Sequence, residues 1–552
     1  MEQVRMLLAI VLSFVVFLVW QVFFVDKQPM EKPGTIVESQ EQLSKMPPVE
    51  EQFDVSSGTA PVDSDAASIP SIKRETLVTV NTPLYQVKIA GQGALFKSLT
   101  LKRYRETADE GSENKELIRE DNPYGTVETS FYGNVSLPMD QAVYKTVNPV
   151  ESLDVTDRPE ALSLVWRSPE GIVVEKKFTF RPDTYAVDLD LIIKNGTSRS
   201  VKGQLGLSLN NWAGESEGRY GFVGPSGLID NKMNRVKIKD IDENNLFSGD
   251  VDWIAIQDRY FISALIARQA VNAKMKLDSR EGKWLKNTFL LPEANVNPGT
   301  MKTFEYQLFF GPKSMAVLKT VGHGLEKAVN FGMFDFIAKP CLWLMNVLYK
   351  AIPNYGVAII ILTVLIKIVL WPLGTKSYKS MNEMKRLQPL MAELREKYKD
   401  DKKKMNEEIM GLYKLYKINP MGGCLPMVMQ IPVFFALYRM LYEAIELRHA
   451  PFLGWINDLS APDRLFHFGF SIPFMQPPYG IPVLTIVMGA TMFLQQKMSP
   501  APGDPNQAKM MMLMPLFFTV IFINFSSGLV LYWLVNNILS VSQQYYISKK
   551  YA

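Results

Sequence analysis

The stretch Ile361–Leu373, "ILTVLIKIVLWPL", decides the fold class, because it is apolar over a helix length and carries one charge, Lys367. A charged side chain at the centre of a bilayer costs at least ~2.5–3.5 kcal/mol on insertion scales, so a lysine at that depth suggests a functional role. The alternative is snorkelling, in which the apolar stem of the lysine carries its ammonium to the membrane interface. The stretch therefore predicts a membrane-spanning helix whose one charge needs an explanation.

Other apolar segments extend this prediction to a polytopic α-helical membrane protein with six transmembrane helices. Residues 1–25 contain Met6–Val25, an uncharged run of about 20 residues that is long enough to span ~30 Å of hydrocarbon as an N-terminal anchor. The other five runs form a predicted five-helix core over residues 355–546. They are residues 355–373, 423–445, 481–496, 510–525 and 528–546.

Loop charge predicts the orientation of these spans. Residues 374–421 are dense in lysine and arginine, whereas residues 446–480 contain only Arg448 and Arg464. Basic loops stay on the cytoplasmic side, so the first loop is expected in the cytoplasm and the second outside it. With six spans, both termini are then cytoplasmic, and the large region between the first two spans is periplasmic if the envelope has two membranes.

That large region divides by composition into three parts. Residues 26–75 are rich in Pro, Ser, Glu and Gln, which predicts a disordered periplasmic linker. Residues 76–320 contain short alternating runs between turns, such as "GIVVEKKFTF" and "YAVDLDLIIKNG", and this period of two predicts an antiparallel β-sandwich. Residues 333–352 mix aromatic, apolar and lysine residues, which suits an interfacial amphipathic helix.

The basic loop has a helical pattern of its own. Met384, Met391 and Tyr398 are seven residues apart, and Leu387 and Leu394 repeat that spacing. Two helices with narrow apolar seams, joined near "KDDKKK", predict a cytoplasmic helical hairpin over residues 376–417.

Polar residues recur inside the apolar runs. Thr363 and Lys367 are four residues apart and share one helix face, and Gln430 and Asn524 lie in other runs. A single intramembrane amide is explained by helix packing, worth ~0.6 kcal/mol. For a set that includes a lysine, a hydrated cavity explains the pattern equally well.

Composition excludes several classes of function. The chain of 552 residues has three histidines and two cysteines, which leaves histidine-built or cysteine-built metal sites poorly supplied. It contains no GxxxxGK[ST] stretch, and its net charge of +4 is too small to argue for nucleic acid. We expect no cofactor, no metal, no nucleic-acid partner and no enzymatic reaction.

Four longer motifs carry a resemblance to a known family. They are "NPMGGCLPMVMQIPVFFALYRML", "FLGWINDLSAPD", "GATMFLQQKMSP" and "FSSGLVLYWLVNNILSVSQQYYI". Together they closely resemble the YidC/Oxa/Alb3 family of membrane protein insertases, and the large β-domain looks like that of the Gram-negative bacterial type.

The resemblance implies a five-helix insertase core with a hydrophilic groove, open to the cytoplasm and to lipid, and an inserted periplasmic all-β supersandwich. A positive residue of the second span, usually arginine in the family, sits in that groove, and Lys367 matches it here. Lysine keeps the charge but loses the planar five-donor fork of arginine. The substrate-groove residues expected on this basis are Lys367, Thr363, Gln430, Asn524, Tyr532 and Trp533.

The implied function is insertion and folding of newly made proteins in the bacterial inner membrane, alone or with the Sec translocon. Nascent membrane proteins and membrane lipids are the implied partners, with the ribosome and the signal recognition particle pathway as further possibilities. The chain ends at "ISKKYA", without the long basic tail that some relatives use at the ribosome, so ribosome binding through a tail is not expected.

Two alternatives come from other classes of function. A secondary transporter would show repeated halves and paired ionisable residues, and this sequence shows neither a repeat nor an intramembrane acid to pair with Lys367. A membrane-anchored periplasmic sugar-binding or sugar-modifying protein would use the sandwich. Sugar mutarotation typically needs His and Glu, and residues 76–312 contain no histidine.

Overall fold

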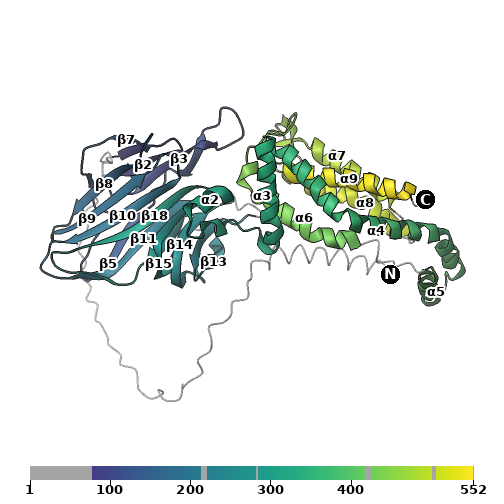
Figure 1. Cartoon of the computed structure of the whole chain (residues 1–552), viewed down its shortest axis with the longest axis horizontal. Helices are drawn as coiled ribbons and strands as arrows, with labels where there is room; N and C mark the ends of the chain where they lie inside the picture. Colours follow the sequence, from purple (N-terminus) through teal and green to yellow (C-terminus); the bar gives the residue numbers. More distant parts are fainter. Residues whose placement is uncertain (1–76, 213–220, 281–283, 417–424, 500–504, 551–552) are drawn as a thin grey trace, which may run out of the picture. The chain divides into compact units, whose positions relative to one another are not determined.

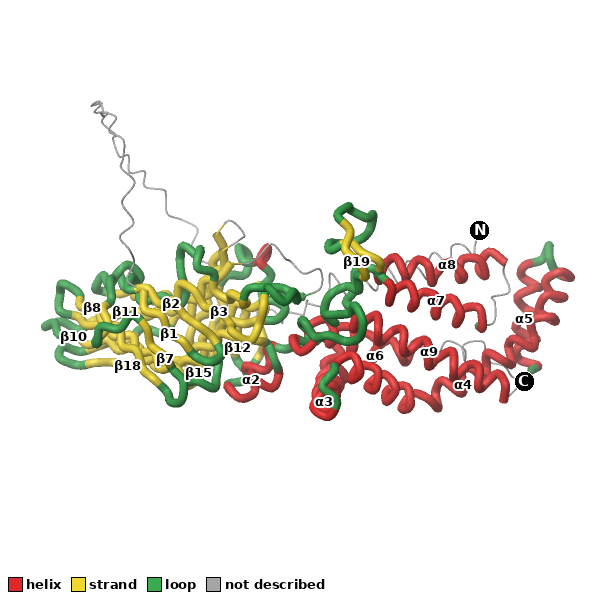
Figure 2. The backbone as a smooth tube through the Cα atoms, turned by 90° about the horizontal axis from the view of Figure 1, so that it is seen from above, coloured by secondary structure: helices red, strands yellow, loops and turns green. Residues whose placement is uncertain are grey.

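The computed structural model describes residues 77–212, 221–280, 284–416, 425–499 and 505–550 (Figure 1). These residues belong to one unit, Thr76–Ala552. The expected N-terminal anchor (1–25) and linker (26–75) lie outside the described residues. Along the described chain, the strands β1–β18 come first and the long helices follow, with one small two-stranded sheet between helices (Figure 2).

The β-rich region contains two large sheets. The smaller sheet has five strands in the order β4 (Asn114–Ile118), β3 (Phe96–Arg105), β2 (Tyr85–Ala90), β1 (Leu77–Asn81) and β7 (Ser152–Asp154). The main path of the larger sheet is β13 (Lys232–Arg235), β12 (Gly224–Ile229), β14 (Leu246–Gln257), β15 (Phe261–Arg280), β18 (Met301–Pro312), β10 (Ala186–Asn195), β9 (Ile172–Phe180), β8 (Glu160–Arg167) and β6 (Lys145–Thr146). Off this path, β11 (Val201–Trp212) pairs with β16 (Trp284–Leu290), β17 (Ala294–Val296) and β5 (Glu128–Gly133).

The strand pairing agrees with the antiparallel expectation, with one exception. Among the strand pairs of the described residues, only β1 and β7 are parallel, joining Thr79–Asn81 to Ser152–Asp154. Strand β9 shows the expected period of two, with every second residue from Ile172 to Phe180 buried. That alternation turns one face of β9 toward the core and the other toward the surface.

Aromatic side chains pack the two sheets against each other. The ring centroid of Phe96, in β3 of the smaller sheet, lies 5.1 Å from that of Phe178 in β9 and 5.6 Å from that of Phe310 in β18. All three side chains are buried. Sheets that pack face to face through such side chains form a sandwich, as the period-two pattern predicts.

A lysine is buried in this core. Lys176 of β9 has no exposed surface, and its Nζ donates hydrogen bonds to the carbonyl oxygens of Gly93 (2.7 Å) and Val127 (3.1 Å). Burial lowers the pKa of Lys176 to about 7. A neutral amine has two N–H donors, and each of these two carbonyl oxygens accepts one hydrogen bond from Lys176.

The helical region follows β18. Its helices are α2 (Met315–Val321), α3 (Asp335–Ala351), α4 (Tyr355–Lys397), α5 (Lys402–Leu415), α6 (Leu425–Glu443), α7 (Val483–Met498), α8 (Pro505–Phe522) and α9 (Ser527–Lys550). Short 3₁₀ turns cover Leu325–Ala328, Gly332–Phe334 and Ile445–Leu447 in this region, and another, Ile238–Asp240, lies between β13 and β14 of the β-rich region. Strands β19 (Leu465–Phe468) and β20 (Tyr479–Ile481) form the small sheet between α6 and α7.

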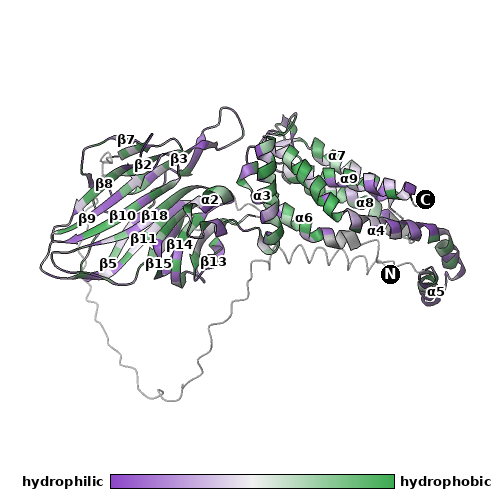
Figure 3. Ribbon diagram, viewed as in Figure 1, coloured by the Kyte–Doolittle hydropathy of each residue, from purple (hydrophilic) through white to green (hydrophobic). Residues whose placement is uncertain are grey.

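Helix α4 is longer than the sequence suggested. The sequence pattern placed the end of the span at residue 373 and a separate hairpin helix after it, whereas α4 continues without a break through Pro372 and Pro389 to Lys397. The side chain of Asn354 caps its start by accepting a hydrogen bond from the Val357 backbone N–H (3.1 Å). Its residues change from hydrophobic to hydrophilic along its length (Figure 3). A single helix therefore joins the apolar stretch to a basic segment, residues 374–397, which we call the basic arm of α4.

The basic arm of α4 turns back into α5. Asp401 caps α5 by accepting from the Lys404 backbone N–H (3.0 Å), close to the expected joint at "KDDKKK". Leu387 and Met391 of the predicted seam are buried, and the Tyr413 hydroxyl lies 3.5 Å from the Met391 sulfur. Helix α5 therefore packs along the second half of α4 through the seam.

Helix α3 has one buried and one exposed apolar face. Ala338, Leu342 and Met345 are buried, whereas Phe336 and Trp343 are among the exposed large hydrophobic residues. Within the described residues, one helix, α4, is long and apolar enough to cross a membrane by length and composition, and residues 509–522 form a shorter apolar helix.

Candidate functional site: the polar face of α4 and α9

Lys367 lies on α4 and points to α9. It is twelve residues from the start of α4, or about 18 Å along the helix axis at 1.5 Å per residue. Its Nζ donates a hydrogen bond to the Ser540 hydroxyl (2.7 Å), and that hydroxyl donates to the Asn536 carbonyl oxygen (2.7 Å). Ser540 is buried while Lys367 is half-buried, so a fixed hydroxyl holds the ammonium at the edge of the helix pair.

Ser540 belongs to a polar stripe on α9, which we define as Asn536, Asn537, Ser540, Gln543 and Gln544. Steps of three and four residues place all five on one side of a helix. The last four are buried, although α9 begins as an apolar helix. A buried row of amides and hydroxyls inside a helical core is costly unless its members find partners.

Two other helices supply partners to this stripe. The Gln543 amide nitrogen donates to the Trp371 carbonyl oxygen on α4 (3.0 Å), and the Asn537 amide nitrogen lies 3.4 Å from the Thr491 hydroxyl on α7. Gly374 permits the first contact, since a Cβ at that position would lie 2.8 Å from the Gln543 amide nitrogen. The Gln543 and Gln544 side-chain oxygens have no hydrogen-bond partner among the described residues. The stripe therefore contains two buried acceptors without a hydrogen-bond partner among the described residues.

Gln430 and Tyr532 meet at a second polar contact between helices. Tyr532 of α9 is buried, and its hydroxyl and the side chain of Gln430 on α6 form a hydrogen bond. Two of the residues singled out from the sequence are thus brought together, from segments about a hundred residues apart.

Trp533 belongs to an aromatic cluster next to that contact. Its ring lies 4.6 Å from that of Phe434 on α6 and 4.8 Å from that of Phe522 on α8, both edge-on. Edge-to-face pairs of this kind stabilise packing beyond the area that they bury. Trp533 accordingly joins α6, α8 and α9 through apolar contacts.

Thr363 shares the α4 face with Lys367 but is not open to solvent. It is 2% exposed, and its hydroxyl donates to the Ile359 carbonyl oxygen within its own helix (2.6 Å). The Thr363 hydroxyl is therefore satisfied within α4, and the side chain is packed in the protein interior one turn before Lys367.

Asn524 lies in a different place from the one expected. It follows the end of α8 at Phe522, and its amide nitrogen donates to the Phe474 carbonyl oxygen (2.8 Å) while its amide oxygen accepts from the Gln476 backbone N–H (2.8 Å). The Arg464 guanidinium is 3.3 Å from the same amide oxygen. The apolar pattern around Asn524 predicted part of a span, but Asn524 lies in the turn between α8 and α9, where these partners, about 50 to 60 residues upstream, hold it against the loop before α7.

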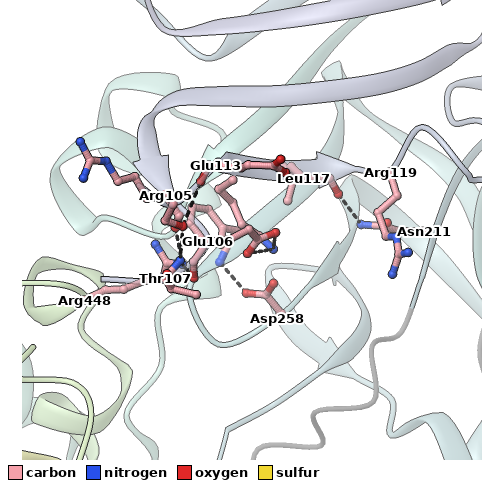
Figure 4. A network of polar contacts seen from close by, with 12 residues as sticks. Arg105, Glu106, Thr107, Glu113, Leu117, Arg119, Asn211, Asp258 and Arg448 are labelled. Carbon is pink, nitrogen blue, oxygen red and sulfur yellow. Dashed lines mark hydrogen bonds and ion pairs between the residues drawn. The ribbon is translucent and has the colours of Figure 1, made fainter. Parts of the chain in front are cut away.

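The segment after α6 also contacts the β-rich region. Arg448 donates from one guanidinium nitrogen to the carbonyl oxygens of Arg105 (2.7 Å) and Glu106 (3.1 Å), at the end of β3 (Figure 4). Nearby, Arg259 donates to the Tyr442 carbonyl oxygen (2.7 Å) and lies over the Tyr442 ring. At this junction, the two arginine side chains thus donate hydrogen bonds to backbone carbonyl oxygens at the end of β3 and near the end of α6.

We call Lys367 together with the α9 stripe the polar face of α4 and α9. This face can attract charge and form hydrogen bonds. No ion pair joins Lys367 to a carboxylate of the described residues, and these residues contain no group of histidine, cysteine and acidic side chains that could hold a metal. The face offers one cation, hydroxyls and amides, beside apolar helix surfaces. Such a face can attract and solvate an acidic or polar segment without breaking a bond.

A β-sandwich followed by a helical core, with α4 long and apolar enough to cross a bilayer, is typical of a membrane protein with a large domain outside the bilayer. Family models match two parts of the chain: "YidC periplasmic domain" matches residues 77–344 and "60Kd inner membrane protein" matches residues 347–552. The chain belongs to the YidC family of membrane protein insertases.

Curated relatives support this membership over the whole length. The chain is 42% identical to "Membrane protein insertase YidC" of Syntrophus aciditrophicus (strain SB), with 99% of each chain covered. It is 39% identical to the protein of the same name from Pelobacter propionicus, again with 99% of each covered. A solved structure described as an active YidC insertase with its first transmembrane domain resolved is 19% identical, covers 86% of this chain and 93% of that one, and has a TM-score of 0.38.

Proposed function

We propose that this chain inserts newly made proteins into the bacterial inner membrane through a hydrophilic groove lined by the polar face of α4 and α9. The observation that carries the proposal is the Lys367–Ser540 contact inside the helical core. Relatives over the full length are named membrane protein insertases, a function without a chemical reaction.

The proposed mechanism is solvation followed by partitioning. Moving an unpaired polar group into hydrocarbon costs several kcal/mol, so a polar tail cannot cross a bilayer unaided. The Lys367 ammonium attracts acidic residues of the tail, and the amides and hydroxyls of the α9 stripe exchange hydrogen bonds with its backbone. Burial of the substrate's hydrophobic segment in lipid, at ~25 cal/mol per Å², then supplies the driving force.

The proposed topology has six spans, with both termini and the α4–α5 hairpin in the cytoplasm and the β-rich region, a supersandwich, in the periplasm. Loop charge supports it, because the basic arm of α4 and α5 contrasts with the loop between α6 and α7. The interfacial role of α3 is supported by its exposed Phe336 and Trp343. Membership of the insertase family supports the proposed partners, which are nascent membrane proteins, membrane lipids, the Sec translocon, and the ribosome with the signal recognition particle pathway.

Reconstitution tests the function directly. Purified full-length chain in lipid vesicles should insert a single-span substrate with a short acidic tail, measured as protection of that tail from added protease. Empty vesicles give the background. A variant lacking the β-rich region should still insert the substrate, whereas a periplasmic sugar-modifying protein would depend on that region. Protection no greater than in empty vesicles would refute the proposed function.

A further inference from the structure

The loop between α6 and α7 carries an exposed aromatic surface that the insertion mechanism does not use. We define the 465–482 hairpin as β19, β20 and the residues between and just after them. Phe466, Phe470 and Phe474 are 68%, 65% and 82% exposed. From Leu465 to Pro482 the sequence contains no aspartate, glutamate, lysine or arginine. A solvent-facing loop with this composition is unusual, because such loops are normally rich in charge.

Two of these phenylalanines occupy left-handed backbone conformations. Phe466 has φ +56° and Phe474 has φ +65°. A bulky residue at positive φ is a genuine outlier that persists only where the surroundings hold it. Neither side chain packs into the core of the protein, so packing within the chain gives no reason for phenylalanine at either position.

A polar clasp fixes the hairpin to the turn between α8 and α9. Arg464, itself buried, donates to the carbonyl oxygens of Pro478 (2.8 Å) on the hairpin and Ile523 (2.8 Å) after α8. Asn524 binds the other side of the hairpin through the Phe474 carbonyl and the Gln476 N–H. The clasp thus holds the phenylalanines outward at a fixed position.

That position is the end of two helices with apolar exteriors. The hairpin leads directly into α7, which exposes Ile486 and Val487, and the clasp joins it to the end of α8, which exposes Leu516 and Phe517. Figure 2 shows β19 beside these helix ends. An exposed apolar surface that continues the exterior of membrane helices fits the interfacial layer of a bilayer, where aromatic residues collect.

We propose that the 465–482 hairpin is a lipid-interface anchor whose phenylalanines insert into the headgroup–acyl boundary of the leaflet opposite the cytoplasmic α4–α5 hairpin. The partner is the lipid itself, because protein interfaces carry arginine and a polar rim that this surface lacks. The anchor would fix the depth of α7 and α8 beside the substrate path. The proposal rests on the proposed placement of α7 and α8 in the bilayer and not on insertase activity.

Site-specific fluorescence tests the anchor. A full-length background with Cys341→Ser and Cys424→Ser receives a single cysteine at Phe466, Phe470 or Phe474, labelled with the environment-sensitive dye NBD. Each protein is reconstituted in phosphatidylcholine–phosphatidylglycerol vesicles, with and without lipids that carry a nitroxide quencher high on the acyl chain. Tyr132→Cys, an exposed aromatic position in β5 (60% exposed), is the matched aqueous control, and Leu516→Cys on α8 reports the placement of that helix.

We expect blue-shifted emission and several-fold stronger lipid quenching at the three hairpin positions than at position 132. Emission and quenching equal to those at position 132 would overturn the proposal. Blue-shifted emission without lipid quenching would also overturn it, since a protein surface, such as a second copy, would then cover the hairpin. Quenching at position 516 without quenching at the hairpin refutes the anchor alone. Absence of quenching at position 516 and at the hairpin together refutes both the placement of α8 and the anchor.

Discussion

Replacing Lys367 by alanine should slow the insertion of substrates with acidic tails while leaving the helical core folded. The change removes the cation and its hydrogen bond to Ser540 but leaves Thr363 buried beneath it. Two unit charges ~4 Å apart interact by about 1 kcal/mol at the dielectric constant of water and about 4 kcal/mol at an effective value of 20. Lys367 is half-buried, so we place its interaction with one substrate carboxylate between these limits, at ~2 kcal/mol, which corresponds to ~30-fold in rate.

The assay is the initial rate of tail protection in reconstituted vesicles, measured for a substrate with two acidic tail residues and for the same substrate with those acids changed to amides. Lys367→Arg should retain insertion because charge is the required property, and Lys367→Glu should be slower than Lys367→Ala. The neutralised substrate should be insensitive to all three changes. Lys376→Ala, an exposed lysine farther along α4, is the matched control and should behave as wild type. Equal rates for Lys367→Ala and wild type on the acidic substrate would show that the lysine merely snorkels.

Three further outcomes are expected. Ser540→Ala should slow insertion of the acidic-tailed substrate by ~2–10-fold, which corresponds to the loss of one modest hydrogen bond. Ser542 is an exposed serine on α9 whose hydroxyl makes the same kind of hydrogen bond within the helix, so Ser542→Ala should leave the insertion rate unchanged. Equal effects of the two changes would show that Ser540 does not position Lys367. Replacing residues 384–416 by a Gly–Ser linker should impair insertion but not accumulation in the membrane, measured by insertion rate and by immunoblot of membranes, and a normal rate would exclude substrate capture by the α4–α5 hairpin. Burial lowers the folded-state pKa of Lys176 to about 7, while the unfolded chain keeps the proton up to about 10.5. The free energy of unfolding of wild type relative to Lys176→Met should therefore be constant below pH 7 and should rise above pH 7, in favour of wild type, by at most ~1.4 kcal/mol per pH unit. Hydrogen exchange of β9 in the intact protein measures this, and a fall in the stability of wild type relative to Lys176→Met above pH 7 contradicts the assignment.

Local patterns in the sequence predicted much of this fold. The period of two in "IVVEKKFTF" matches the alternating burial of β9, and the seven-residue seam matches the burial of Leu387 and Met391. These features depend on neighbours in the chain, so sequence periodicity contains them. The parallel pairing of β1 with β7 was not predicted, because it joins segments more than 70 residues apart.

The same distinction applies to the site. Lys367 stands out in the sequence as the one charge in an apolar run, but its partner Ser540 does not, since the contact spans 173 residues. A usable signal existed, because the α9 stripe repeats at steps of three and four residues. Asn524 shows the opposite case. Its position inside the apolar run 510–525 predicted an amide within a membrane helix, whereas its contacts with Arg464 and Phe474, 60 and 50 residues away in the sequence, hold it in the turn after α8. The period of two in β9 predicts that Lys176 lies on the buried face of the strand. It does not predict why a lysine is tolerated there, which the hydrogen bonds to the carbonyl oxygens of Gly93 and Val127 explain.

Photo-crosslinking from α9 tests the central claim most directly. A photoreactive amino acid is placed at Asn536, whose carbonyl accepts from Ser540, or at Ile538, an exposed apolar position two residues away. Each protein is then illuminated with a nascent membrane protein stalled while its polar tail is in transit. The account predicts tail crosslinks from position 536 and few or none from position 538. Equal crosslinking of the tail at both positions, or none at 536, would contradict a substrate path along the polar face of α4 and α9.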